Sequence, residues 1–107
     1  MKISILNLAP LRQGENFKEA IDAMIRLAKK ADELGYERYW IAEHHNTKSV
    51  ASSATQLLIQ RTLDNTSNIR VGSGGVMLPN HSPYLIAEQY GTLETLYPNR
   101  VDLGLGR

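Results

Sequence analysis

The hydrophobic and polar positions alternate between two kinds of segment along the chain. Four compact apolar runs begin near residues 3, 38, 70 and 101, and each is typical of a buried strand. Between them lie three segments with apolar residues at helical spacing, the longest running from Phe17 to Leu34. The pattern predicts strands at about residues 2–8, 38–43, 69–78 and 100–107, separated by three helices. The repeat is roughly 30 residues long, which is typical of a βα unit.

Local signals mark where the predicted helices begin and end. Asn16 precedes Glu19 by three residues, which is the spacing of a helix N-cap and its reciprocal partner. Gly35 follows the first helix, where it can adopt the left-handed conformation of a C-cap. Pro83 suits the first turn of the third helix, and Pro98 ends that helix. These signals support the same element order as the periodicity.

Apolar strands that alternate with amphipathic helices indicate an α/β fold with a parallel sheet covered by helices. Two architectures use such repeats, the open doubly wound sheet and the closed (β/α)8 TIM barrel. Four strands and three helices would leave unpaired sheet edges and an uncovered face. A barrel typically needs about 250 residues, and the chain has 107. We therefore expect residues 1–107 to form the first half of a (β/α)8 barrel.

Composition narrows the class of protein further. The 12 basic and 11 acidic residues give a net charge of +1, which offers no electrostatic footprint for nucleic acid or for an anionic membrane. The chain has no cysteine, which fits a reducing compartment. Its N-terminus lacks the pattern of a signal peptide, and no apolar stretch approaches the roughly 20 residues of a membrane helix. We expect a soluble, cytoplasmic protein.

The stretch "AEHHN" places three ionisable residues, Glu43, His44 and His45, directly after the second predicted strand. In parallel α/β proteins the carboxyl ends of the strands carry ligands and catalytic groups. Catalysis or ligand contact and an ordinary polar loop both remain open as interpretations. A metal site is less favoured, because neighbouring residues of an extended chain point to opposite sides. The spacing matches no zinc motif, and only His81 remains as a further imidazole.

Glycines and one arginine mark the ends of the third and fourth predicted strands. Gly72, Gly74 and Gly75 remove side chains where a flat group can approach the backbone, although a β-bulge would explain them equally well. Arg107 follows "DLGLG", where its guanidinium can grip a phosphate or simply be solvated. The single tryptophan, Trp40, is expected to pack in the core.

Together these motifs resemble those of the bacterial luciferase-like family of flavin-dependent monooxygenases. The resemblance rests on "YWIAEHHN", "VGSGGVMLPNHSP" and "YPNRVDLGLGR", one at each of the last three strands, and on "LNLAPLRQGE" after the first. The motif "YPNRVDLGLGR" carries Asn99 where the family usually has glycine. The resemblance covers the whole chain and is strongest to the non-luminescent bacterial oxidoreductases. Gly106 stands where luciferases tend to have cysteine, which argues against light emission.

The resemblance implies a (β/α)8 barrel that binds reduced FMN at its C-terminal mouth and uses O₂ to oxidise a small organic substrate. The reduced FMN would come from a partner flavin reductase. His44 matches the family's catalytic histidine, and Glu43 would lie beside it on the substrate rim. Gly74 and Gly75 match a cofactor-binding position with a non-prolyl cis peptide against the flavin ring. Arg107 matches an arginine near the FMN phosphate, and no residue is assigned to a metal.

The resemblance also sets the remaining expectations. The family tends to form homodimers through its outer helices. Some relatives use the deazaflavin F420, which is an alternative to FMN here. Half a barrel cannot exclude water from the reacting flavin, so the chain alone is expected to be inactive. An alternative of another class is a stand-alone half-barrel that pairs with a second copy and serves as a binding or scaffold module.

Overall fold

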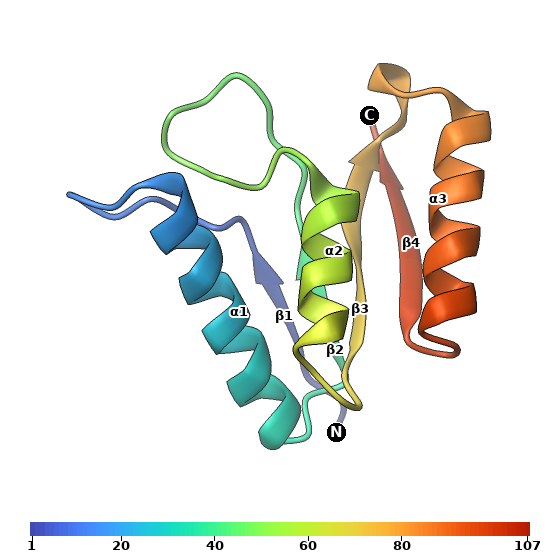
Figure 1. Ribbon diagram of the computed structural model, residues 1–107, viewed down its shortest axis with the longest axis horizontal. Coiled ribbons are helices and arrows are strands. Elements are labelled where there is room, and N and C mark those ends of the chain that lie inside the picture. Colours follow the sequence, from blue (N-terminus) through green and yellow to red (C-terminus); the bar gives the residue numbers. More distant parts are fainter.

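The computed structural model describes residues 1–107 and has the expected α/β architecture, with one parallel sheet in the order β1-β2-β3-β4. The three helices lie on the same side of the sheet (Figure 1). No helix is both long and apolar enough to cross a membrane. The elements in chain order are β1 (Ser4–Asn7), α1 (Phe17–Glu33), β2 (Arg38–Ile41), α2 (Thr55–Asp64), β3 (Arg70–Met77), the short 3₁₀ helix η1 (Leu78–Asn80), α3 (Pro83–Leu96) and β4 (Val101–Gly106).

The predicted boundary signals are confirmed at α1 and α3. The Asn16 side chain accepts a hydrogen bond from the Glu19 N–H at 2.8 Å, and the Glu19 carboxylate accepts one from the Asn16 N–H at 3.0 Å. This capping box satisfies two amides that a helix start otherwise leaves free. Gly35 follows the end of α1 with a φ of +80°, and Pro83 is the first residue of α3. Sequence spacing therefore located these helix ends well.

The core lies between the helices and one face of the sheet. Tyr39, Ile41 and Val71 are fully buried there, and the Tyr39 hydroxyl donates a hydrogen bond to the Met24 carbonyl at 3.0 Å. The expectation that Trp40 packs in this core was wrong. Successive side chains of a strand point to opposite faces, so a residue between Tyr39 and Ile41 faces away from the helices. Trp40 is half-buried on that opposite face.

The face of the sheet that the helices leave uncovered is apolar and carries an ion-pair network. Leu6 pairs in register with Trp40, and its side chain is 57% exposed. The Arg38 guanidinium lies 5.4 Å from the centre of the Trp40 ring. Arg38 and Arg70 both contact the Asp102 carboxylate, at 2.7 and 2.9 Å. In a closed barrel this face is the interior.

Candidate functional site

The strand ends place the predicted site residues at one edge of the sheet. Because the four strands are parallel, the segments that follow β2, β3 and β4 all emerge at the same end (Figure 1). Glu43, His44 and His45 follow β2, while Gly74 and Gly75 lie near the end of β3. Ligands of parallel α/β folds bind at this end of the strands. The structure divides these residues into separate groups.

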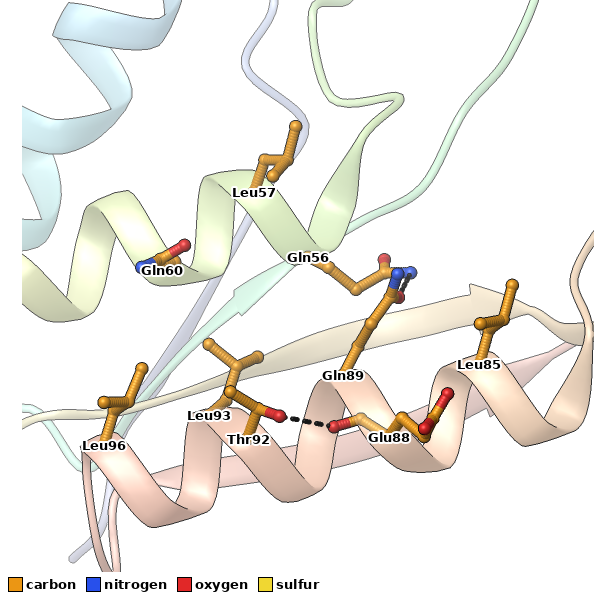
Figure 2. A pocket seen from close by; sticks show the side chains of 9 residues that line it. All are labelled: Gln56, Leu57, Gln60, Leu85, Glu88, Gln89, Thr92, Leu93 and Leu96. Atoms are coloured by element: carbon orange, nitrogen blue, oxygen red, sulfur yellow. Dashed lines mark hydrogen bonds between the residues drawn. The ribbon is translucent and has the colours of Figure 1, made fainter.

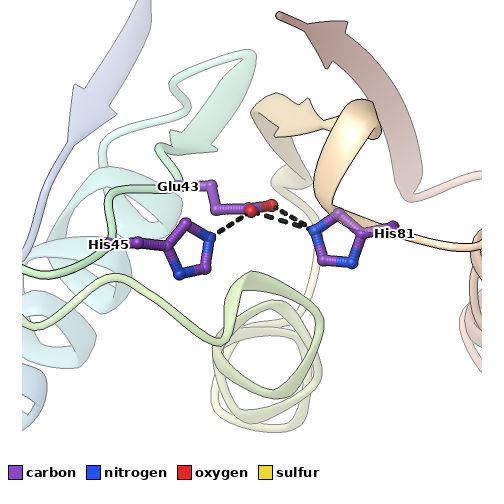
Figure 3. A group of neighbouring side chains, drawn as sticks. All are labelled: Glu43, His45 and His81. Carbon is purple, nitrogen blue, oxygen red and sulfur yellow. Dashed lines mark hydrogen bonds and ion pairs between the residues drawn. The ribbon is translucent and has the colours of Figure 1, made fainter.

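A buried carboxylate lies at the centre of the first group (Figure 3). The Glu43 side chain is 0% exposed. His81 Nε2 lies 2.9 and 3.0 Å from its two carboxylate oxygens, and His45 Nε2 contacts Oε2. The backbone N–H of Met77 donates to Oε1 at 3.2 Å. Glu43, His45 and His81, called the Glu43 cluster below, therefore join the ends of β2 and β3 to the start of α3.

Electrostatics keep the central carboxyl group ionised. Burial acts to raise the pKa of Glu43, because it penalises the charged form. The hydrogen bonds from His45, His81 and the Met77 N–H outweigh burial and hold the pKa of Glu43 below its ordinary value. The expectation that Glu43 lies on an open rim needs correction. The charge is satisfied by donors from three segments, and these donors cover it from solvent.

His44 lies apart from the Glu43 cluster. Its backbone N–H donates to the Ser52 carbonyl at 2.8 Å, which fixes the loop after β2. Its side chain is exposed and lines a hollow with Phe17 and Leu57, next to the starts of α1 and α2. An exposed imidazole with no side-chain partner is free to bind a ligand or carry a proton. The structure does not place His44 in the same hollow as Gly74 and Gly75.

Gly74 and Gly75 lie in a second hollow, on the face of the sheet that the helices leave uncovered. The peptide bond between them is cis, as the resemblance implied. The hollow is lined by these two glycines with Leu6, Trp40 and Gly104, so an apolar indole adjoins exposed backbone. The pairing of β3 with β4 shifts register between Ser73 and Val76, which is the irregularity that the glycine run allowed. A flat ring fits this type of surface, because no side chain projects from Gly74.

Strand packing explains several of the glycines without any ligand. A Cβ would lie 2.2 Å from a backbone atom of the neighbouring strand at Gly104, 2.5 Å at Gly72 and 2.9 Å at Gly75. No real Cβ makes contacts that short, so β3 and β4 approach each other this closely only with glycine at these positions. Gly74 differs, because its nearest neighbour would be the Trp40 Cβ at 3.1 Å. Among the glycines of β3, Gly74 is thus the one that is not tied to backbone packing.

Arg107 lies beyond the end of β4, exposed and without an ion pair. Its guanidinium is free to bind an anion, but no other predicted site residue contacts it. Sequence reasoning also missed the part that His81 plays. His81 follows the end of β3 as Glu43 follows the end of β2, and this shared place at the strand ends was the signal that could have joined them.

A buried tyrosine hydroxyl lies near the same cluster. Tyr90 of α3 is 6% exposed, and its hydroxyl oxygen has no hydrogen-bond partner. Burial raises the pKa of Tyr90 to about 12, and the negative charge of Glu43 acts in the same direction. A buried hydroxyl without a partner costs free energy, typically about 1–3 kcal/mol. Tyr90 is therefore a donor available to an oxygen atom that enters this region.

The groove between α2 and α3 has a different character (Figure 2). Exposed leucines line it, with Leu57 at 69%, Leu85 at 52% and Leu96 at 56% exposure. The Gln56 side-chain amide donates to the Gln89 amide oxygen at 2.9 Å across the groove. Apolar and amide groups at this outer surface suit contact with another protein surface better than catalysis.

Comparison with known proteins agrees with the fold and the motifs. The profile of the family described as luciferase-like monooxygenase matches residues 1–107. A protein named luciferase-like monooxygenase from Escherichia coli K12 is 57% identical over 104 residues, which is 97% of this chain and 31% of that protein. The chain thus spans about a third of the length of the relatives that it matches.

Solved structures give the same result. The crystal structure of apo-MsnO8 superposes with a TM-score of 0.97 at 48% identity and covers 99% of this chain and 32% of that one. The oxygenating component of 3,6-diketocamphane monooxygenase from Pseudomonas putida, a type II Baeyer–Villiger enzyme in complex with FMN, has a TM-score of 0.91 at 26% identity. Its match covers 99% of this chain and 29% of that one. With its family profile matched from end to end, the chain belongs to the luciferase-like monooxygenase family.

Proposed function

We propose that this chain provides the first four strands of an FMN-dependent monooxygenase that oxidises a small organic substrate with O₂. The observation that carries the proposal is the hollow of exposed backbone at Gly74 and Gly75 beside the Trp40 indole, where a flat ring fits. The FMN complex of the Baeyer–Villiger relative supports the choice of cofactor. Reduced FMN, supplied by a separate flavin reductase, would provide the activation of O₂.

The chain's own residues would bind this cofactor and manage one proton. Gly74 and Gly75 would let the ring approach the backbone, with Trp40 as an apolar neighbour. Arg107 has an unpaired guanidinium, which suits the FMN phosphate because its planar fork matches phosphate oxygens. His44 is exposed at the same end of the sheet, and one nitrogen of its imidazole would hold or deliver a proton. His44 lies in a hollow separate from Gly74 and Gly75, so this role requires His44 to move toward the bound flavin ring, and that movement is part of the proposal.

The uncovered face of the sheet limits what 107 residues can do. Oxidation by a reduced flavin requires that water be kept from the reacting centre. Here the hollow at Gly74 opens on a face that no helix covers, so we propose that the chain alone is inactive and that activity belongs to a full barrel. We further propose a cytoplasmic location, without nucleic-acid or membrane partners.

We propose a homodimer as the assembly, with the leucine-lined groove between α2 and α3 as its contact surface. The exposed Leu57, Leu85 and Leu96 favour this surface because all three line the groove between α2 and α3 (Figure 2). Light scattering of the protein and of a Leu57→Lys variant tests the assembly. A dimer that the variant converts to a monomer supports it, and a monomeric wild-type protein contradicts it.

Cofactor titration of the full-length protein tests the main proposal, with FMN and F420 compared by fluorescence. Saturable binding of FMN, weakened at least tenfold by Arg107→Ala, is expected. In the same protein His44→Ala should lower substrate oxidation strongly while the Kd for FMN stays within twofold. Binding of F420 without FMN would replace the monooxygenase proposal by an F420-dependent oxidoreductase. A stable dimer that binds neither cofactor would favour the scaffold module instead.

A further inference from the structure

We propose that the Glu43 cluster is a binding site for a divalent transition ion of the zinc class. One donor atom from each of Glu43, His45 and His81 can be chosen so that all three lie within 4.8 Å of one another. The three residues come from separate segments, so the strand ends and not a sequence motif bring them together (Figure 3). This proposal is independent of the flavin site, because the cluster lies outside the hollow at Gly74 and Gly75.

The buried carboxylate at the centre of the cluster has hydrogen-bond donors around it but no lysine or arginine beside it. The Glu43 side chain is completely buried, and its only ion-pair partners are the two imidazoles. No lysine or arginine contacts it, and a buried carboxylate is costly unless a positive group or a metal ion compensates it. A bound divalent ion would supply that compensation while the imidazoles remain neutral.

The donor set matches zinc in number and kind. Two imidazoles and one carboxylate form a three-ligand set that leaves a fourth position for water. Zinc binds such ligands at about 2.0–2.2 Å, which places tetrahedral donors roughly 3.3 Å apart. His81 Nε2 already lies 2.9 and 3.0 Å from the Glu43 oxygens, so an ion requires only a small outward movement of the rings. The His45 side chain is 41% exposed on a loop, so that movement is possible.

Groups around the cluster would orient the ligands. The Met77 N–H donates to Oε1 of Glu43 and leaves the other carboxylate oxygen to face the ion. The Tyr90 hydroxyl is buried without a partner and lies close enough to the cluster to feel the charge of Glu43. Outer hydrogen bonds such as that from the Met77 N–H are typical of metal sites, where they fix the ligands and tune the metal.

The test is zinc titration of the untagged full-length protein by calorimetry, after removal of metals with EDTA, together with Co²⁺ absorption in the visible range. One ion per chain, bound with a micromolar or lower Kd, and a tetrahedral Co²⁺ spectrum are expected. His45→Gln should weaken binding at least tenfold. His44→Gln is the matched control, because it is the adjacent imidazole outside the cluster, and it should leave the Kd within twofold.

Two results would overturn the proposal. One is the absence of stoichiometric binding by protein whose circular dichroism shows that it is folded. The other is equal loss of affinity in His44→Gln and His45→Gln, which would assign the binding to adventitious surface imidazoles. The Glu43 side chain is buried, so a Glu43→Gln protein can fail to fold. The His45 side chain is exposed, and His45→Gln is therefore the decisive variant. His81→Gln gives an independent second arm, with the same tenfold loss expected.

Discussion

Replacement of Gly104 by alanine tests how closely β3 and β4 must approach each other. The added Cβ would lie 2.2 Å from the Ser73 carbonyl oxygen, whereas real Cβ contacts essentially never fall below 3.0 Å. The strands must therefore separate by roughly 0.8 Å, the difference between those two distances. Ser73 is fully buried, and its hydroxyl bonds the Gly104 carbonyl and N–H at 2.9 and 3.0 Å. Separation of the strands strains both hydrogen bonds.

The expected cost follows from these two effects. An added methyl group that clashes with closely packed atoms costs typically about 1–3 kcal/mol. Each weakened hydrogen bond adds about 0.5–1.5 kcal/mol. Gly104→Ala should therefore lower the free energy of unfolding by about 2–6 kcal/mol, a large part of the stability of a small domain.

Urea unfolding followed by the fluorescence of Trp40 measures this loss, because the Trp40 ring would lie 3.7 Å from the new Cβ. Gly91→Ala is the matched control. Gly91 lies within α3, and a Cβ there would meet nothing within 4 Å. This variant should gain about 0.5–1 kcal/mol from helix propensity. A Gly104→Ala protein within about 0.5 kcal/mol of wild type would refute the argument that strand packing requires this glycine.

Three further changes test contacts elsewhere in the fold. Asn16→Ala removes the N-cap of α1 and should cost about 1 kcal/mol by urea unfolding. Asp102→Asn leaves Arg38 and Arg70 without their carboxylate, and we expect a loss of about 1–2 kcal/mol that shrinks in high salt. Asp32 accepts three backbone N–H bonds, at 2.8, 2.9 and 2.8 Å, which outweigh burial and hold its pKa below the ordinary value. Its stabilisation is thus complete above about pH 3.9 and is lost as pH falls through the folded pKa, so stability measured from pH 6 down to pH 2 should fall less in Asp32→Asn than in wild type.

The sequence predicted those features that depend on spacing along the chain. Asn16 and Glu19 are three residues apart, and the hydrogen bonds between them need only one helical turn. The order of strands and helices follows in the same way from periodicity. Trp40 was misplaced because composition favours burial for tryptophan, while the alternation of β2 places it opposite Tyr39. The correct face was available from the same rule that describes any strand.

The site was harder to predict than the fold because its contacts join distant segments. Glu43 and His81 are 38 residues apart, and only the parallel register of β2 and β3 brings them together. The sequence placed both near strand ends but gave no distance between them. The separation of His44 from Gly74 depends on the path of the loop after β2, which periodicity does not specify. The sequence therefore predicted the candidate residues of each segment, but not which residues of different segments contact one another.

The ion pairs of Arg38 and Arg70 with Asp102 lie at the amino ends of β2, β3 and β4, opposite the edge that carries the histidines. Arg100, the residue before β4, adds hydrogen bonds to the Thr66 hydroxyl and the Ile69 carbonyl at this same end. The sheet is thus held by arginine ion pairs at its amino end and by the buried Glu43 carboxylate at its carboxyl end. None of the predicted site residues lies at the amino ends of the strands, so these arginines and Asp102 hold the register of β2, β3 and β4 without taking part in the chemistry of the opposite edge.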